Sequence, residues 1–255
     1  MQVISICNFK GGVGKTATAA AIAQGLNARS KPKAKALLID CDPQGTATKS
    51  CYGIRDEQHL TIYDVITGKA QAVDAIRHTD AGDVLPYSKQ MANIDIEFNG
   101  NPRAYFMLRE ALASLEGVYT HIIIDTAPGI SLATFQAMTA SNGVLIPIMS
   151  SPDNCDNLTE TYERVELIRK YNYNPDLKII GVFFDMHTGR SNILKQFEDL
   201  YKNMCKAYKI PLLKTTIRRA AVVQESHALA QSLFEYAPRS NVTSDYTNLI
   251  KELKL

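Results

Sequence analysis

The chain begins Met1-Gln-Val-Ile-Ser-Ile-Cys-Asn-Phe9, continues Lys10-Gly11-Gly12-Val13-Gly14-Lys15-Thr16, and then enters the alanine-rich segment Ala17-Thr-Ala-Ala-Ala-Ile-Ala23. A strand, a glycine loop and a helix former thus arrive in the order of a phosphate-binding loop. Glycines let backbone N–H groups face a phosphate, and the helix N-terminus adds partial positive charge. We expect Gly11, Gly12, Val13 and Gly14 to supply these donors. Lys15 would bridge the β- and γ-phosphates of a nucleotide, and the Thr16 hydroxyl would ligate Mg²⁺.

Outward from this loop, short apolar runs alternate with helical patterns. Strands are expected at 2–8, 35–40, 83–87, 120–125, 143–149, 177–184 and, briefly, 211–216. Helices are expected at 15–28, 61–67, 103–116, 131–141, 156–171, 191–208 and about 241–254. This alternation predicts an α/β fold with a doubly wound, mostly parallel sheet, a three-layer α/β/α arrangement of the P-loop NTPase type, in a single domain over 1–255. Ligands of such sheets bind at the carboxyl ends of the strands.

Composition excludes several classes of protein. The 255 residues are 45% hydrophobic and 21% charged, which is ordinary globular usage and rules out disorder, collagen and coiled coil. Every apolar run is far shorter than the roughly 20 residues that span a bilayer. The N-terminus lacks the pattern of a signal peptide, so we expect a cytoplasmic protein. Five widely spaced cysteines without a C-x-x-C pair argue against a disulfide framework or a zinc site.

Charge is unevenly distributed along the chain. The net charge is +2, but residues 1–162 hold 13 Lys/Arg against 16 Asp/Glu, whereas 163–255 hold 15 against 10. The most basic stretch is 190–219, with 8 basic and 2 acidic residues. Two interpretations remain open for this stretch, a solvated helix face and an anion-binding surface.

Two strands end in carboxylates that suit a magnesium nucleotide. Asp40 and Asp42 follow strand 35–40 at spacing i, i+2, so in extended backbone both side chains point to one face, toward the phosphate loop. An Asp-Pro turn with solvated carboxylates is the alternative. Asp125 ends the apolar strand 120–125, an arrangement that resembles a Walker B motif and holds Mg²⁺, usually through water.

The loop also departs from the ordinary P-loop in an informative way. Phe9 stands where the first glycine is expected, and an extra lysine, Lys10, follows it. This pattern resembles the variant loop of the ParA/MinD-type ATPases. Nearly the whole chain resembles the short, Soj-like ParA ATPases of plasmid and chromosome partitioning. The stretches that support the resemblance are Thr61–Ile66, Leu108–Leu112, Ala137–Ile148, Gly189–Asn192 and Tyr236–Ser240.

The resemblance implies a biological cycle as well as a fold. ATP and Mg²⁺ would be the cofactors, and ATP binding would drive a homodimer. The dimer would bind double-stranded DNA without sequence preference, on the nucleoid. A ParB-type centromere-binding protein would stimulate hydrolysis and release it. No Glu or Gln base stands beside Asp125, so we expect slow hydrolysis without a partner. No membrane partner is expected.

Individual roles follow from the same resemblance. Lys10 would reach the partner subunit's nucleotide, and Asp42 would position the attacking water, so Lys10, Lys15 and Asp42 are the expected catalytic residues. Asp40 would support Mg²⁺ or the loop, and the Ala17 N–H would contact phosphate. The base-contacting turn would comprise Thr216, Ile217 and Arg218, and extend to Arg219, although Arg218 replaces the family's proline.

The expected DNA contacts are Arg190, Lys195, Lys214, Arg218 and Arg219, and each could instead form a structural salt bridge. Val222 stands where relatives have a second DNA-binding arginine.

A MinD-like ATPase that acts on a membrane or protein surface is the main alternative. Such a protein would need an amphipathic anchor at its C-terminus. The tail here carries Tyr246, Leu249, Ile250 and Leu253 on one helical face, a stripe that more often docks a last helix on the core.

Overall fold

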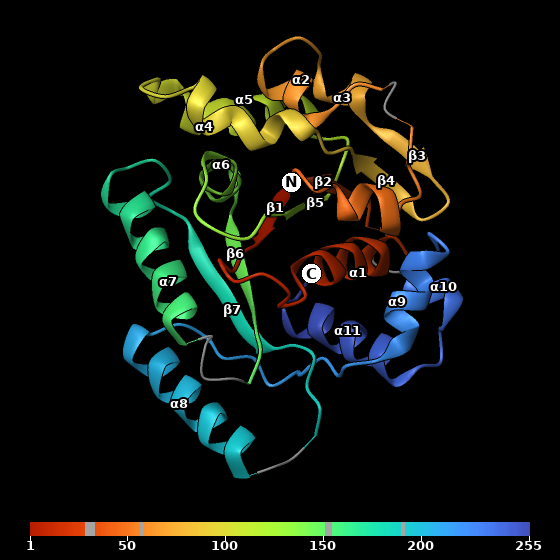
Figure 1. The fold of residues 1–255 in the computed structure, drawn as a ribbon, viewed down its shortest axis with the longest axis vertical. Helices are drawn as coiled ribbons and strands as arrows, with labels where there is room; N and C mark the ends of the chain where they lie inside the picture. The colour runs from red at the N-terminus through yellow and green to blue at the C-terminus, as the bar shows by residue number, and fades with distance from the viewer. Residues whose placement is uncertain (29–33, 57–58, 151–154, 190–191) are drawn as a thin grey trace.

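A computed structural model describes residues 1–28, 34–56, 59–150, 155–189 and 192–255. Its strands form one sheet of seven in the order β3-β4-β2-β5-β1-β6-β7 (Figure 1). All neighbours are parallel except β3 and β4. The strands are β1 (Gln2–Ile6), β2 (Ala36–Asp40), β3 (Arg77–Thr79), β4 (Gly82–Leu85), β5 (His121–Asp125), β6 (Gly143–Ile148) and β7 (Lys178–Phe184).

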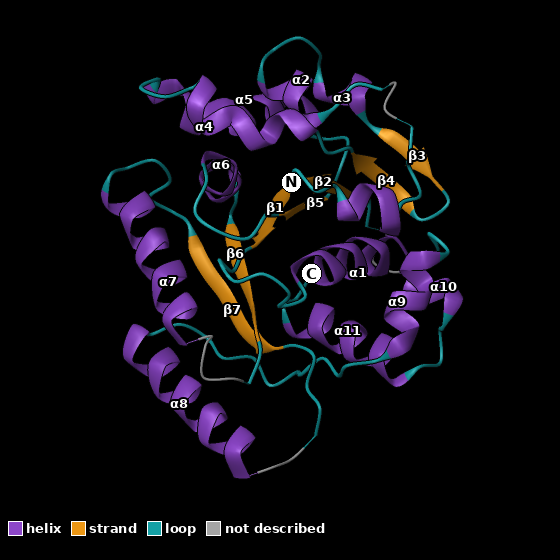
Figure 2. Ribbon diagram, viewed as in Figure 1, coloured by secondary structure: helices purple, strands orange, loops and turns teal. Residues whose placement is uncertain are grey.

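Helices cover both faces of this sheet (Figure 2). The α-helices are α1 (Lys15–Ala28), α2 (Ile62–Ile66), α3 (Ala72–Ala75), α4 (Ile94–Glu97), α5 (Met107–Leu112), α6 (Leu132–Ala140), α7 (Cys155–Lys170), α8 (Asn192–Tyr208), α9 (Ala221–Ala228), α10 (Leu233–Tyr236) and α11 (Asn241–Glu252). Alternate residues of β5 pack into two different hydrophobic cores, one on each face of the sheet. Ile123 packs with α1 and α11, whereas Ile122 and Ile124 pack with α2, α5 and α6. The period of two thus confirms the expected three-layer arrangement.

The helix after the glycine loop lies unusually close to the C-terminal helices. A Cβ atom on Gly25, in the last turn of α1, would lie 2.5 Å from Phe234 and 2.6 Å from Ile250. Glycine within a helix costs roughly 0.5–1 kcal/mol relative to alanine, and here it permits this close packing. Tyr246, Leu249 and Ile250 of α11 are all buried. The apolar stripe of the tail therefore docks on the core, as predicted.

Several sequence expectations are wrong in detail. Segment 211–216 is no regular strand: it contacts β7 through one isolated bridge, between Val182 and Leu212. At this bridge Val182 donates to the Pro211 carbonyl and accepts from the Leu213 N–H, both at 2.8 Å, but Pro211 has no N–H with which to extend the ladder toward the start of β7. The helix expected at 103–116 is divided into a 3₁₀ turn, α5 and a second 3₁₀ turn.

Some elements were not expected at all, namely α3, α4, α9, α10, the antiparallel edge strand β3 and a π-helical turn at Ala47–Cys51. These elements are short, and short elements give little periodic signal in a sequence. Within the described ranges, no helix is long and apolar enough to cross a membrane.

Candidate nucleotide-binding site

The glycine loop joins the central strand β1 to α1, at the carboxyl edge of the sheet. Gly12 and Gly14 have φ angles of +75° and +85°, a region that side chains disfavour, so these two positions require glycine. Gly11 and Gly12 are exposed on the rim of the loop, whereas Val13 and Gly14 are buried beneath it. The structure therefore forms the exposed, curled backbone that anion binding needs.

Lys15 turns back into the loop. Its side chain is 6% exposed, and its Nζ donates a 2.8 Å hydrogen bond to the Lys10 carbonyl oxygen. Burial lowers the pKa of Lys15, while the nearby carboxyl of Asp125 works in the opposite direction. An ammonium group that has lost water and holds one carbonyl is well suited to bind an anion. Thr16 and Ala17 follow it, half-buried, in the first turn of α1.

Two strand-end carboxyls lie side by side next to this lysine. Asp40 and Asp125 are register partners on the neighbouring strands β2 and β5. Both Asp125 oxygens are buried and make no well-formed hydrogen bond within the described part of the chain, although the nearby Thr16 hydroxyl favours the charged carboxylate. Burial raises the pKa of Asp125 well above its ordinary value, and the adjacent carboxyl of Asp40 raises it further. A cation would satisfy these oxygens.

These groups fit Mg²⁺ better than they fit an all-protein metal cage. The described residues contain no cluster of three or more His, Cys, Asp or Glu side chains placed to hold a metal. Mg²⁺ commonly keeps several waters and takes only one or two protein carboxylates together with substrate phosphates. Asp125, with the Thr16 hydroxyl, suits that mode.

Asp40 has a different environment. Its Oδ2 accepts hydrogen bonds from the Thr48 N–H at 2.8 Å and the Thr48 hydroxyl at 2.7 Å, and its Oδ1 accepts one from the Asp42 N–H at 3.1 Å. Burial raises the pKa of Asp40 to about 6. Of the two roles expected for Asp40, this geometry suits support of the loop after β2.

Asp42 is the buried turn residue of that loop. It is 8% exposed, its Oδ1 accepts from the Gln44 N–H at 2.9 Å, and its carbonyl accepts from the Gly45 N–H at 2.9 Å. An Asp-Pro turn is thus present, as the alternative interpretation held. However, the Asp42 carboxylate is buried rather than solvated, and it lies at the edge of the sheet that carries the phosphate loop.

Thr48 is a residue that sequence reasoning missed, and its contacts give a stability prediction. The hydroxyl donates to Asp40 and accepts from the Tyr87 N–H at 3.0 Å. We expect Thr48→Val to lower the free energy of unfolding by about 2–3 kcal/mol at pH 8, because two buried polar groups lose a partner.

The loss should be smaller at pH 5, since the raised pKa leaves Asp40 protonated there. Urea unfolding at both pH values measures this difference. The control is Thr46→Val, at an exposed position two residues earlier whose hydroxyl forms no cap. Equal losses at pH 5 and pH 8 would contradict the assignment.

The expected base-contacting turn runs beside the end of β7. The Ile217 N–H donates to the Phe184 carbonyl at 2.8 Å, and the Ile217 carbonyl accepts from the His187 N–H at 2.9 Å, so the backbone of this buried residue is already paired. Thr216 is exposed.

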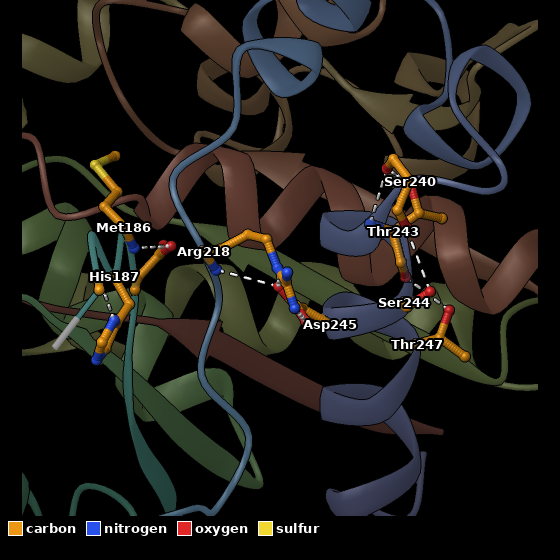
Figure 3. Close-up of polar contacts among 10 residues, drawn as sticks. Met186, His187, Arg218, Ser240, Thr243, Ser244, Asp245 and Thr247 are labelled. Atoms are coloured by element: carbon orange, nitrogen blue, oxygen red, sulfur yellow. Dashed lines mark hydrogen bonds and ion pairs between the residues drawn. The ribbon is translucent and has the colours of Figure 1, made fainter.

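Arg218 forms the salt bridge that was its alternative interpretation. Its Nε lies 2.6 Å and its Nη2 2.9 Å from the Asp245 carboxylate on α11, and its N–H also donates to Asp245 (Figure 3). Ser240 is the N-cap of α11, and its Oγ accepts a hydrogen bond from the Thr243 N–H. The start of the helix fixes the position of Asp245 on it. Arg218 is therefore ion-paired within the chain although its side chain is 51% exposed, and its expected DNA contact stays a prediction.

The other expected DNA contacts have different surroundings. Lys195, on α8, is exposed, and so are Lys214 and Arg219 on the segment that returns beside β7. The Lys214 N–H donates to the Glu252 carboxylate at 2.8 Å, and the exposed Lys214 side chain keeps its charge near that carboxylate. Arg190 lies outside the described residues.

Asp185 is a second residue that sequence reasoning missed. It directly follows β7 and is 4% exposed, and its Oδ2 accepts a 3.3 Å hydrogen bond from the Thr18 hydroxyl of α1. A signal was present in the sequence: Ile39-Asp40, Ile124-Asp125 and Phe184-Asp185 each end an apolar strand in a carboxylate.

A mostly parallel sheet with a glycine loop between a central strand and a helix, beside paired strand-end carboxyls, defines a P-loop nucleotide-binding protein. Comparison with known proteins shows to which family within this class the chain belongs. The chain matches the AAA domain family over residues 1–179 and belongs to the ParA/Soj family of partitioning ATPases.

Full-length relatives support this placement. The chain is 32% identical to the sporulation initiation inhibitor protein Soj of Bacillus subtilis, over 99% of this chain and 98% of that protein. It is 30% identical to the chromosome partitioning protein ParA of Caulobacter vibrioides, over 99% and 94% of the two chains.

Among solved structures, the septum site-determining protein MinD of Pyrococcus horikoshii, complexed with Mg-ADP, matches with a TM-score of 0.75 and 25% identity over 99% and 95% of the two chains. The expected fold class and family are confirmed, and the chain is an ATPase.

Proposed function

We propose that this ATPase is a partitioning switch. Mg-ATP binding assembles a homodimer, the dimer binds double-stranded DNA without sequence preference, and a ParB-type partner stimulates hydrolysis and releases it. The observation that carries the proposal is the different placement of two lysines in one loop. Lys15 is buried and turned inward, whereas Lys10 is half-buried and borders the exposed glycines of the rim. A second subunit that approaches this rim meets Lys10.

The residues of the loop and of the strand ends have separate roles in binding the nucleotide and in its hydrolysis. Gly11 to Gly14 and Ala17 present backbone donors, Lys15 neutralises the phosphates of its own subunit, and Lys10 neutralises those of the partner. Thr16 and Asp125 would hold Mg²⁺, which would supply positive charge to offset the charge of the phosphates. Asp42 would orient the attacking water. Thr216 borders the base.

DNA binding in this proposal rests on exposed charge. Phosphate contacts need only charge and reach, and they carry no sequence information. Lys195, Lys214 and Arg219 supply such charge on α8 and the segment that follows it, and Arg190 belongs to the same stretch of the sequence. Arg218 contributes less, because its guanidinium is already paired with Asp245.

The membrane alternative has weaker support from the tail. A membrane-binding helix must offer apolar side chains to the lipid. Those of α11 are buried against the core, with Tyr246 1% and Leu249 0% exposed.

The proposal is tested with Asp42→Ala, which should block hydrolysis and accumulate the ATP-bound dimer. We expect this variant to be retained on duplex DNA of arbitrary sequence with Mg-ATP but not with Mg-ADP. Retention should fall by at least about tenfold between 50 and 200 mM salt, since phosphate contacts release counterions.

A matched pair of variants locates the surface. Lys214→Ala in the Asp42→Ala background should weaken retention without affecting dimerisation. Lys178→Ala should leave retention on DNA unchanged. Lys178 is exposed at the amino end of β7, opposite the carboxyl ends of the strands where the nucleotide site lies. A dimer that forms with ATP but is not retained on DNA would refute the DNA step and direct attention to a membrane or protein surface.

A further inference from the structure

Asp185 is a buried acidic residue packed against the back of the phosphate loop. A Cβ atom on Gly14 would lie only 1.9 Å from its Oδ2, so that oxygen occupies the space beside the Gly14 backbone. The same Oδ2 accepts from the Thr18 hydroxyl, and Oδ1 accepts from the Met186 N–H at 2.6 Å. Figure 3 shows Met186 beside the segment that carries Arg218. The carboxyl is therefore held in place beneath the groups that face a nucleotide.

No cation among the described residues compensates this carboxyl. The basic groups on neighbouring segments hold other carboxylates: His187 Nε2 lies 3.0 Å from Glu198, and Arg218 holds Asp245.

The nearest cation in the sequence, Lys15 at the start of α1, points away from Asp185: its Nζ bonds the Lys10 carbonyl oxygen and its charge lies next to Asp125. From α1 Asp185 meets the Thr18 hydroxyl, and from α11 the buried phenol of Tyr246, whose pKa is raised by burial and by the charge of Asp185. From β6 it meets the carbonyl of Ile148, which accepts from the Asp185 N–H. A charged Asp185 is thus stabilised by two hydrogen bonds alone.

We propose that Asp185 takes up a proton when ATP binds, so that a neutral carboxylic acid stands behind Gly14 in the nucleotide-bound protein. The inference rests on the proposed nucleotide site in this loop. The physical reason is repulsion: a nucleotide brings several negative charges to one side of the loop while a carboxylate lies on the other, and nearby like charge disfavours the ionised form.

The proton comes from solvent and returns to it when the nucleotide leaves. Asp185 acts here as a positioning residue, because it touches the loop and not the phosphates.

The free protein is poised for this uptake near neutral pH. Burial raises the pKa of Asp185 to about 7, against the lowering effect of its bonds from Met186 and Thr18. A pKa that rises further on binding means that protons are taken up above pH 7. Apparent affinity for ATP should consequently fall as pH rises from 7 to 9, by up to about tenfold per unit.

Isothermal titration calorimetry measures the uptake directly. A non-hydrolysable Mg-ATP analogue is titrated into the protein at pH 7.5 in PIPES, HEPES and Tris, whose ionisation enthalpies differ. We expect the binding heat of the wild-type protein to vary with buffer by roughly half a proton per nucleotide. Asp185→Asn keeps the shape and the contact to Thr18 but cannot titrate. Because Asp40 and Asp125 also have raised pKa values, the test is the difference between the two proteins: uptake by Asp185→Asn should be smaller than uptake by the wild-type protein by roughly half a proton per nucleotide.

Further variants separate this role from a structural one. Thr18→Val removes a hydrogen bond that favours the carboxylate, so uptake should shift to higher pH; this variant also serves if Asp185→Asn does not fold. Asp83→Asn, at a hydrogen-bonded carboxylate on β4, should leave uptake unchanged.

Undiminished uptake in Asp185→Asn would overturn the inference, as would nucleotide binding by the wild-type protein without uptake. Absence of nucleotide binding altogether would refute the proposed site as well.

Discussion

Lys15→Ala is expected to reduce both nucleotide affinity and ATP hydrolysis by at least about a hundredfold, which corresponds to a loss of roughly 3 kcal/mol. The reason is that Lys15 is the buried cation of the loop, with its Nζ on the Lys10 carbonyl and its charge next to Asp125. Without it, the paired carboxyls of Asp40 and Asp125 would face the phosphates with no compensating lysine. Calorimetry with Mg-ADP and a phosphate-release assay measure the two losses separately.

The fold of the variant must be checked, because Lys15 also closes the loop on itself. Circular dichroism and urea unfolding should show a folded protein, since the cores on both faces of the sheet do not include this side chain. Lys49→Ala is a suitable control: it removes a lysine that bonds a backbone carbonyl in a neighbouring turn, at Gln44, and should leave hydrolysis within about twofold. Hydrolysis by Lys15→Ala at the wild-type rate would show that this lysine does not act on phosphate.

Lys10→Ala is expected to abolish ATP-driven dimerisation while the monomer stays folded and binds nucleotide within a few-fold of wild type. The two lysines lie in one loop, yet only Lys15 is buried inside it, whereas Lys10 is half-buried beside exposed Gly11. In the proposed dimer, Lys10 crosses to the partner's phosphates, where a charge-assisted contact in a dry interface is worth several kcal/mol. Light scattering with Mg-ATP and with Mg-ADP reports the dimer.

The two lysine variants together distinguish action within a subunit from action across a dimer. Lys15→Ala should fail at nucleotide binding, and Lys10→Ala only at assembly. An ATP-dependent dimer of normal stability in Lys10→Ala would remove the proposed role of Lys10 and, with it, the main support for nucleotide contacts across the dimer interface. A mixture of Lys10→Ala with wild-type chains should form dimers weakened to an intermediate degree, because one of the two crossing contacts remains.

Much of the site was predictable because its residues are consecutive in the sequence. The glycine loop, with its flanking strand and helix, needs only local backbone conformation, and Gly12 and Gly14 adopt the left-handed angles that the motif implies. The strand-end position of Asp125 followed equally from an apolar run that stops at a carboxylate. Strands and helices with strong periodicity were located to within a few residues, whereas the short pieces between α2 and β5 were not, because they carry too few residues to show a period.

The sequence by itself therefore determined most of the longer strands and helices, the phosphate loop and the family to which the chain belongs. Only the tertiary structure decided what surrounds each charged group. Thr48 satisfies Asp40 from 8 residues away, Asp245 pairs with Arg218 from 27, and Thr18 binds Asp185 from 167. Burial and pairing set the charge state of a side chain, and both depend on segments that meet only when the sheet has formed. For that reason the sequence left two interpretations of Arg218 open, a DNA contact and a salt bridge, and Asp185 was overlooked.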